Sequence, residues 1–385
     1  MPVKINSPQQ DSEKRLEVLV LGGYGHFGGR ICRRLASNSH ISLCVGGRNH
    51  TKAKQFIASL DVNEQALAPR PIAIDHSSNS FLEDVQLLKP DLVIHTCGPF
   101  QGQDYHVAEC CIESGAHYID LADARKFVCE FSCLDEPARK KRLSLVTGAS
   151  TLPGLSSAVV SSLTNRFGSI DSIRICIAPG NTTPRGLATI KSVLDYCGRP
   201  INWLENGSWI TTYGWQNLKR HRFPSLGHRW LGACDVPDLE LFTTEYPGVR
   251  TVTFHAALEL EIWQFGLWLL AWLSRAGIVA NWSRAARPFK IFSDRLSFLG
   301  TSSGGMFVEV SGQDAAKDAV LTLTWYLTAR NGHGPEIPVI PAVILAEKLA
   351  RGERLRIGAF PCMDEITLDE FAGVVSDLDI SWDIQ

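Results

Sequence analysis

The sequence predicts an α/β protein that begins with a doubly wound parallel sheet, into which an α+β domain on a mostly antiparallel sheet is inserted. Up to about residue 154, short apolar strands alternate with amphipathic helices, the pattern of a parallel sheet with helices on both faces. Beyond residue 155, long irregular stretches separate the strand signals, and this change favours an antiparallel sheet. These later signals lie at residues 170–177, 249–260, 306–310 and 319–328.

Length and composition limit the possible classes of protein. The 385 residues exceed one ordinary hydrophobic core, and 38 Lys and Arg against 40 Asp and Glu leave a net charge of −2, which gives no basic field for nucleic acid. Eleven irregularly spaced cysteines indicate buried thiols in a reducing, cytoplasmic compartment and no metal site. We expect a flexible polar tail over 1–15, a first domain over 16–154, a second over 155–332, and C-terminal helices over 333–385 that return to the first domain.

The first element is an apolar strand that runs into a glycine-rich turn. Gly23, Gly25 and Gly28 have the G-x-G-x-x-G spacing of a strand that turns into a helix. Gly23 permits the tight turn, Gly25 lets the backbone approach a pyrophosphate, and Gly28 lets the helix lie close to the sheet. Ile31 and Leu35 continue an apolar helix face that starts at Phe27. The N–H groups at the start of this helix, in a turn that also holds Tyr24 and His26, predict a dinucleotide site in a Rossmann fold.

The end of the second strand indicates which dinucleotide binds. An NAD-specific site places Asp or Glu here to hold the ribose 2′-hydroxyl. This chain has Gly46 and Gly47, followed by Arg48 and Asn49, with Lys52 one turn further on. The sequence therefore favours NADP(H), whose 2′-phosphate would meet these cations.

The third and fourth strands add residues at the same sheet edge. Asp75 follows the third strand and either reaches the adenine edge or caps the backbone at the next residues. The fourth strand, over 91–96, runs into Cys97, Gly98 and Pro99, and we expect these to shape the nicotinamide site, because ligands of such sheets bind at the carboxyl ends of strands.

The fifth strand, over 117–120, brings two candidate proton donors to this rim. Tyr118 lies within the strand and Asp123 follows it, so two carboxylates, those of residues 120 and 123, are expected at the same edge. In the second domain, Arg185 precedes a glycine and has the planar guanidinium that could clamp a substrate carboxylate.

A tryptophan-rich segment over 262–280 is the other unusual feature. Its uninterrupted apolar core, over 265–273, is too short to span a bilayer, and Arg275 interrupts the longer window. Two interpretations stay open: a helix buried in the core or in a subunit interface, or a helix lying in a membrane surface. Further on, Thr367 and Glu370 form a capping box for a last helix.

Taken in order, these motifs resemble the saccharopine dehydrogenase-like family of NADP-binding oxidoreductases. The resemblance lies in segments 22–28, 46–48, 97–100, 118–123, 153–155, 184–186 and 337–342. It implies a Rossmann domain interrupted by an α/β domain whose sheet often builds a homodimer, with Gly154 and Arg185 facing the substrate. The chain departs from relatives at Ala122-Asp123, where they often carry Gly-Glu, and in its tryptophan-rich segment.

The function expected from the resemblance is NADPH-dependent hydride transfer to an imine, or to a related C=O or C=C bond. The cofactor supplies this chemistry, and the protein supplies position and electrostatics. An alternative is a non-catalytic NADP-binding protein that docks on a membrane or partner through the tryptophan-rich segment. A third hypothesis, a lipid-like substrate, would be favoured if that segment lined the crevice.

Overall fold

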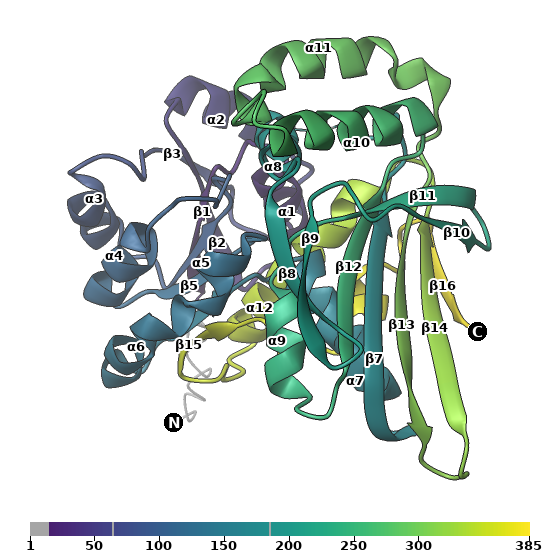
Figure 1. The fold of residues 1–385 in the computed structure, drawn as a ribbon. Helices are drawn as coiled ribbons and strands as arrows, with labels where there is room; N and C mark the ends of the chain where they lie inside the picture. Colours follow the sequence, from purple (N-terminus) through teal and green to yellow (C-terminus); the bar gives the residue numbers. More distant parts are fainter. Residues whose placement is uncertain (1–14, 64, 185) are drawn as a thin grey trace, which may run out of the picture.

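The computed structural model describes residues 15–63, 65–184 and 186–385, and it consists of two sheets with helices around them (Figure 1). The first sheet is entirely parallel and has the strand order β15-β6-β5-β4-β1-β2-β3. Its strands are β1 (Leu16–Leu21), β2 (Ile41–Gly47), β3 (Arg70–Ala73), β4 (Leu92–His95), β5 (His117–Asp120), β6 (Ser144–Thr147) and β15 (Gly358–Pro361). The order reverses between β1 and β4, so the crevice for a ligand lies at the carboxyl ends of these two strands.

Helices cover both faces of this sheet because its strands are apolar on both sides. Val18 and Val20 pack with Ile31 and Leu35 in one core, whereas Leu19 packs in a separate core on the other face. The first face carries α1 (Gly28–Leu35), α2 (His50–Ile57) and α12 (Ile340–Ala350). The second carries α3 (Phe81–Leu88), α4 (His106–Ser114), α5 (Arg125–Cys129) and α6 (Asp135–Lys141). The predicted doubly wound sheet is confirmed.

The second sheet has nine strands and is mostly antiparallel, as predicted, with a parallel pairing between β7 and β12. Strands β7 (Phe167–Ala178), β12 (Thr251–Ala257), β13 (Gly304–Asp314) and β14 (Val320–Ala329) correspond to the four strand signals in the sequence. The sequence analysis missed β8 (Pro200–Glu205), β9 (Ser208–Tyr213), β10 (Lys219–Phe223), β11 (Gly227–Ala233) and β16 (Ile380–Ile384). Much of β9 and β10 is exposed, so neither strand carries a continuous apolar signal.

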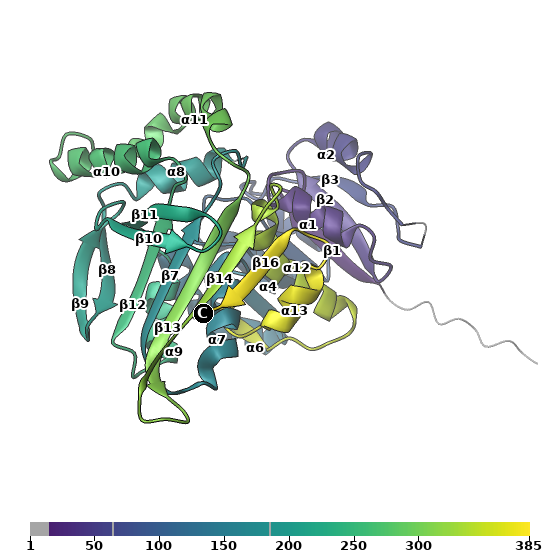
Figure 2. The ribbon, with the colours of Figure 1, turned by 90° about the vertical axis from the view of Figure 1, so that its right-hand side faces the viewer.

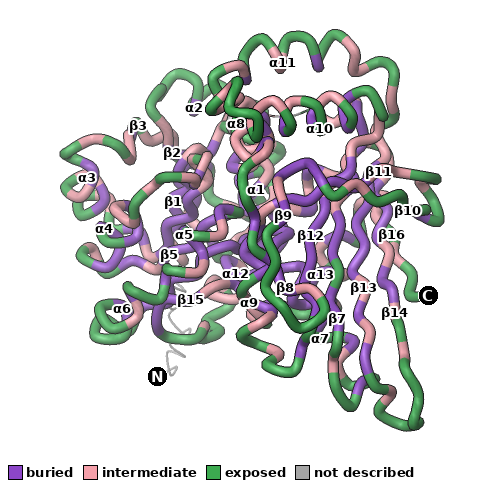
Figure 3. The backbone as a smooth tube through the Cα atoms, viewed as in Figure 1, coloured by how far each residue is buried: buried purple, intermediate pink, exposed green. Residues whose placement is uncertain are grey.

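Two groups of helices accompany the second sheet (Figure 2). α7 (Ser156–Thr164), α9 (Asp238–Glu245) and α13 (Leu368–Val374) lie toward the first domain, whereas α8 (Leu187–Asp195), α10 (Glu261–Arg275) and α11 (Ala286–Arg295) gather at one end. Figure 3 shows buried strands in both sheets and extensive exposed surface on α10 and α11. Shorter helical turns are η1 (Phe131–Leu134), η2 (Thr151–Leu155), η3 (Trp282–Ala285), η4 (Ser297–Leu299) and η5 (Gly334–Val339).

A buried carboxyl group connects two of the helices that accompany the second sheet. Asp238, at the start of α9, is fully buried and accepts a hydrogen bond from the hydroxyl of Ser156 on α7. Burial raises the pKa of Asp238 to about 7, because the charged form loses its hydration there.

The C-terminal segment contributes to both sheets. α12 packs on α1 and β15 extends the first sheet, which agrees with a return to the first domain. The capping box of Thr367 and Glu370 is present at the start of α13. The last strand differs from the expectation of helices alone, because β16 pairs with β14 of the second sheet. Ser381 and Asp383 alternate with apolar residues there, which is the pattern of a half-buried strand, so this strand carried a signal that the prediction of helices overlooked.

Candidate cofactor and substrate site

The glycine-rich turn joins β1 to α1 at the switch point. Gly22 has a φ of 75°, which favours glycine. A Cβ on Gly28 would lie 2.2 Å from the carbonyl oxygen of Gly22 and 2.7 Å from Oγ1 of Thr96, so only glycine lets α1 approach the strand this closely. Gly25 is exposed, and its N–H donates to the same Gly22 oxygen at 2.7 Å. The turn therefore has the glycine-rich shape of a pyrophosphate-binding loop at the N-terminus of α1.

Tyr24 links this turn to the end of β2. A Cβ on Gly47 would lie 2.5 Å from the Tyr24 ring, so the ring lies directly over a glycine. The Tyr24 hydroxyl accepts the N–H of Asn49 at 3.0 Å, and Asn49 caps α2 by accepting the N–H of Lys52 at 2.9 Å. Tyr24 and Asn49 thus connect the pyrophosphate turn with the segment where the ribose 2′ position is expected.

Arg48 directly precedes Asn49 and is exposed. Its guanidinium lies close enough to His76 and Cys97 to lower the pKa of both, although burial dominates and raises the pKa of Cys97 to about 12. Asp75 accepts the N–H of Ser77 at 3.1 Å, which is the capping alternative left open by the sequence. The cationic character at this edge fits a 2′-phosphate.

The loop after β4 is held in place by side chains that reach its carbonyl groups. Oγ1 of Thr96 donates to the Leu21 carbonyl at 2.7 Å, and Nε2 of Gln103 donates to the carbonyls of Cys97 at 2.9 Å and Pro99 at 2.8 Å. Gly98 is exposed between them. These contacts give the predicted nicotinamide edge a fixed shape.

Three side chains lie near one another beside the catalytic candidate Asp123. Nε2 of Gln101 donates to Asp123 at 3.4 Å and to the Tyr196 hydroxyl at 3.0 Å, while the Ser192 hydroxyl donates to Oε1 of Gln101 at 3.0 Å. The surrounding atoms displace water and raise the pKa of Asp123. Ser192 and Tyr196 come from α8 and its C-terminal cap, so this network joins the two domains.

Tyr118 and Asp120 lie below the rim and not on it. Tyr118 is buried with its hydroxyl 3.2 Å from Nδ1 of His95. Asp120 is also buried and accepts the N–H groups of Ala122 at 2.9 Å and Gly148 at 2.8 Å. Neither side chain can contact a substrate here, so we do not assign the proton-donor role to Tyr118.

Of the two candidate substrate residues, Gly154 has no side chain that could make a polar contact with a substrate. Gly154 is buried, and a Cβ there would lie 3.1 Å from Cβ of Pro341, so this glycine serves close packing. Arg185 lies outside the described residues.

The structure also brings together a group that the sequence analysis did not find. His76, His95 and Cys97 place potential metal-ligand atoms within 4.8 Å of one another. Arg48 adds positive charge beside two of them, which opposes a cation, and the group lies at the sheet edge expected to bind the cofactor. We therefore assign it no metal.

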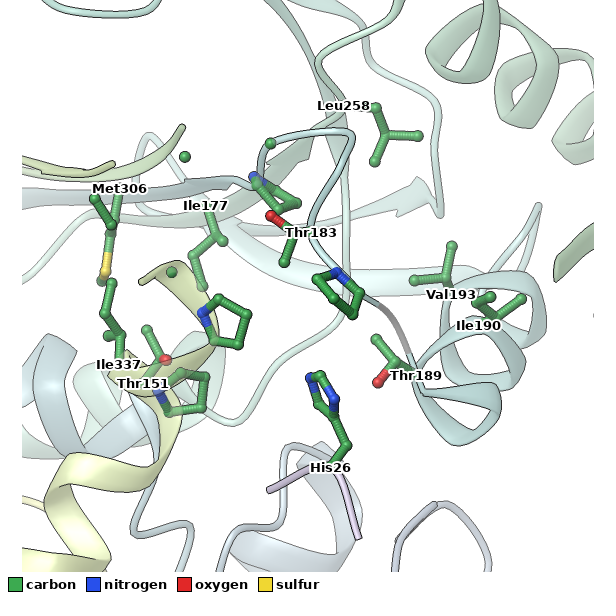
Figure 4. A pocket seen from close by; sticks show the side chains of 18 of the residues that line it. His26, Thr151, Ile177, Thr183, Thr189, Ile190, Val193, Leu258, Met306 and Ile337 are labelled. Atoms are coloured by element: carbon green, nitrogen blue, oxygen red, sulfur yellow. The ribbon is translucent and has the colours of Figure 1, made fainter. Parts of the chain in front are cut away.

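A cavity of about 280 Å³ opens between the glycine turn and the second sheet (Figure 4). His26 and Phe27 of the turn line it on one side, and Ile177 and Met306 line it on the other. Burial lowers the pKa of His26 to about 4, with a smaller effect from Arg30, so this imidazole is neutral at pH 7. The cavity thus begins where the cofactor turn ends.

A salt bridge ties the turn to a further wall of this cavity. Arg30 on α1 donates to the carbonyl of His26 at 2.5 Å, and its Nε lies 2.9 Å from Glu336 of η5. Pro335 and Ile337, the neighbours of Glu336, line the cavity. The turn, α1 and η5 therefore form one connected structure.

Comparisons with known proteins agree with this geometry. Residues 18–144 match the family model described as the saccharopine dehydrogenase NADP binding domain. The structure is similar to saccharopine dehydrogenase (L-Glu forming) from Saccharomyces cerevisiae, with 14% identity, a TM-score of 0.66, and coverage of 96% of this chain and 100% of that chain. No curated protein matches the chain in sequence.

Two further solved structures match with lower TM-scores. An amine dehydrogenase from Mycobacterium smegmatis has 10% identity and a TM-score of 0.44 over 92% of this chain and 96% of that chain. An engineered D-amino acid dehydrogenase bound to NADP+ has 13% identity and a TM-score of 0.44 over 94% and 99% of the two chains. We base no argument on either.

The fold and the glycine turn define an NADP(H)-binding protein of the oxidoreductase class. Residues 18–144 form a domain of the saccharopine dehydrogenase NADP binding type, and the whole chain shares the fold of saccharopine dehydrogenase. Within the described ranges, none of the helices has the length and apolar character needed to cross a membrane.

Proposed function

We propose that the protein is an NADP(H)-dependent oxidoreductase that transfers hydride to a C=N bond, or to a related C=O or C=C bond. The observation that carries the proposal is the glycine turn with Arg48 at one end and an apolar cavity at the other. Bound NADPH supplies a hydride, two electrons with one hydrogen nucleus, and becomes NADP+. The substrate carbon gains the hydride and the neighbouring nitrogen, oxygen or carbon gains a proton.

The chain's own residues would position the cofactor and supply that proton. The first N–H groups of α1 hold the pyrophosphate, and Gly25 leaves room for it. Asp123 is the candidate proton donor, because its raised pKa keeps more of the acid form near neutral pH than an ordinary carboxyl group has. Gln101 orients Asp123 through its 3.4 Å contact.

Cofactor preference provides the first test. A charge-assisted contact with the 2′-phosphate is worth about 1.5–3 kcal/mol, so NADPH should bind roughly ten- to a hundredfold more tightly than NADH. Arg48→Ala should remove most of this preference and leave NADH affinity unchanged, because NADH lacks the phosphate. Lys54→Ala, an exposed lysine on the adjacent helix α2, is the matched control and should change neither.

Titration of both cofactors into wild type and variants measures these constants. Equal affinities for NADPH and NADH in the wild type, or equal losses for both in Arg48→Ala, would show that Arg48 is a solvated surface charge. A screen of NADPH consumption over amine and carbonyl pairs then tests the reaction itself.

A second candidate function, docking on an anionic lipid surface, is favoured by the outer side of α10. This side exposes an apolar stripe formed by Ile262, Phe265, Trp268, Leu269 and Trp272. Ile262 is 64% exposed and Leu269 is 54% exposed, so the helix is not buried as a whole. Arg284, Arg287 and Arg295 are exposed nearby, and arginines beside aromatic residues suit a surface of lipid phosphates.

Co-sedimentation with anionic and neutral vesicles tests this docking. Replacement of both Trp268 and Trp272 by Ser should abolish sedimentation with anionic vesicles and leave NADPH affinity unchanged. Retained vesicle binding would refute the role of the stripe. A shift from dimer to monomer on sizing would instead assign the stripe to contact between two copies of this chain, in keeping with the homodimer that we propose from the family resemblance.

A further inference from the structure

We propose that the cavity beside the glycine turn binds a lipid-like substrate, a hydrocarbon chain or ring system that carries the reducible C=O, C=N or C=C bond. The inference rests on the proposed hydride transfer and names the substrate class for the same site. It comes from the composition of the cavity wall, its position beside the cofactor turn, and the part that α10 takes in it.

The wall is apolar on every side. It is built by the second sheet, α8, α10, α11 and η5, elements that are far apart in the sequence. The apolar side chains that define it include Ile177, Ile190, Leu267, Phe289, Met306 and Ile337. Such a surface binds ligands by removing hydrocarbon from water.

The few polar groups carry no charge. Among the described residues that line the cavity, none is Lys, Arg, Asp or Glu, and His26 is neutral at pH 7. Hydroxyl groups of Thr151, Thr183 and Thr189 are the main remaining polar atoms (Figure 4). A carboxylate or ammonium group of a substrate would lose its hydration here without gaining a countercharge from these residues.

The position of the cavity links it to the chemistry. His26 and Phe27 belong both to the turn that receives the cofactor and to the cavity wall, and Thr151 follows β6 at the same sheet edge. Trp263 lines the cavity, and its buried indole N–H has no acceptor among the described residues. One donor in an apolar wall suits a substrate with a single carbonyl or imine group.

Helix α10 connects the cavity with the outside. Trp263 and Leu267 face inward and line the cavity, whereas Trp268 and Trp272 lie on the exposed side of the same helix. The tryptophan-rich segment therefore lines the crevice, the condition under which the sequence favoured a lipid-like substrate.

The test uses the full-length protein and the uncharged fluorescent probe N-phenyl-1-naphthylamine. Thr189→Trp places a large ring at the cavity wall from an exposed position of α8, and Lys191→Trp places the same ring on the same helix away from the cavity lining. We expect Thr189→Trp to weaken probe binding at least tenfold and Lys191→Trp to leave it within twofold. Equal probe affinity in all three proteins would overturn the proposal.

Activity distinguishes this proposal from the proposed function. With NADPH and methylamine, aldehydes of 8–12 carbons should be reduced at least tenfold more efficiently than aldehydes of similar length that end in a carboxylate. Met306→Ala, which enlarges the cavity, should shift the preferred aldehyde substrate to longer chains, and this test does not require Thr189→Trp to fold.

A preference for the carboxylate-bearing aldehydes would overturn the proposal of a lipid-like substrate and leave the proposed oxidoreductase activity standing. Tight probe binding that Thr189→Trp weakens, with no turnover of any aldehyde, would support the apolar site and count against the proposed reaction.

Discussion

Gly28→Ala should test most directly how the close approach of α1 to β1 contributes to stability and to NADPH binding. The added Cβ would lie 2.2 Å from the carbonyl oxygen of Gly22, which is backbone and already accepts the N–H of Gly25. Contact at normal distance requires α1 to move by roughly 1 Å, and such overpacking costs about 1–3 kcal/mol. The gain in helix propensity from Gly to Ala offsets at most about 1 kcal/mol. We therefore expect a net loss of about 2 kcal/mol, or about 4–8 °C in the Tm of a domain of this size.

The Gly28→Ala substitution should also weaken NADPH binding, in addition to its effect on stability. Moving the start of α1 misaligns the N–H groups that would meet the pyrophosphate, and loss of one charge-assisted hydrogen bond, about 1.5–3 kcal/mol, weakens NADPH binding at least about tenfold. Calorimetric titration of NADPH and thermal unfolding measure the two effects. Gly29→Ala is the matched control, because its Cβ would meet only the Phe56 ring at 3.3 Å, and it should keep both values. A Gly28→Ala protein with unchanged Tm and NADPH affinity within twofold of wild type would refute the close approach of α1 to β1.

Three further substitutions test other parts of the structure. Gly47→Ala should displace the Tyr24 ring, 2.5 Å from the new Cβ, and weaken NADPH binding several-fold in titrations, whereas unchanged affinity would separate Tyr24 from the cofactor. Asp123→Asn should lower kcat at least about tenfold and remove the fall in kcat that occurs as rising pH deprotonates the donor; an unchanged profile would exclude proton donation. Asp238, whose folded pKa of about 7 lies above the unfolded value, stabilises the fold when protonated, and this contribution falls by on the order of 2–3 kcal/mol between pH 5 and pH 8. Asp238→Asn should therefore lose less Tm than wild type over that range, and equal losses would contradict the raised pKa.

The first domain could be predicted from the sequence because its signals are local. Each strand is a short apolar run, the glycines have fixed spacing, and Arg48 stands directly after its strand. The parallel sheet then brings these strand ends to one edge without further information. The capping box at Thr367 is local in the same way.

The sequence predicts less well which side chains at that sheet edge are buried and which are exposed. Tyr118 and Asp120 alternate with Ile119 and are buried beneath the rim, whereas Asp123 lies three residues beyond the strand and is exposed. Sequence position alone does not show where the strand ends and the loop turns outward.

The cavity could not be found from local patterns at all. Its wall combines residues from 26 to 338, which come from many separate elements of both domains. The double role of α10 was hidden for a related reason, because the inward Trp263 and Leu267 and the outward Trp268 and Trp272 belong to one apolar run. Only the packing of α11 and the second sheet against one side of the helix separates them.

The connection from the glycine turn through Arg30 and Glu336 to η5 would couple binding of NADPH to binding of the proposed apolar ligand in the cavity. His26 and Phe27 belong to both sites, so a ligand that fixes this shared wall in one place also fixes it for the other ligand. Reciprocity then requires that any factor by which NADPH strengthens binding in the cavity equals the factor by which an apolar ligand strengthens NADPH binding. The protein can in this way favour the ternary complex over either binary one with no movement of its domains.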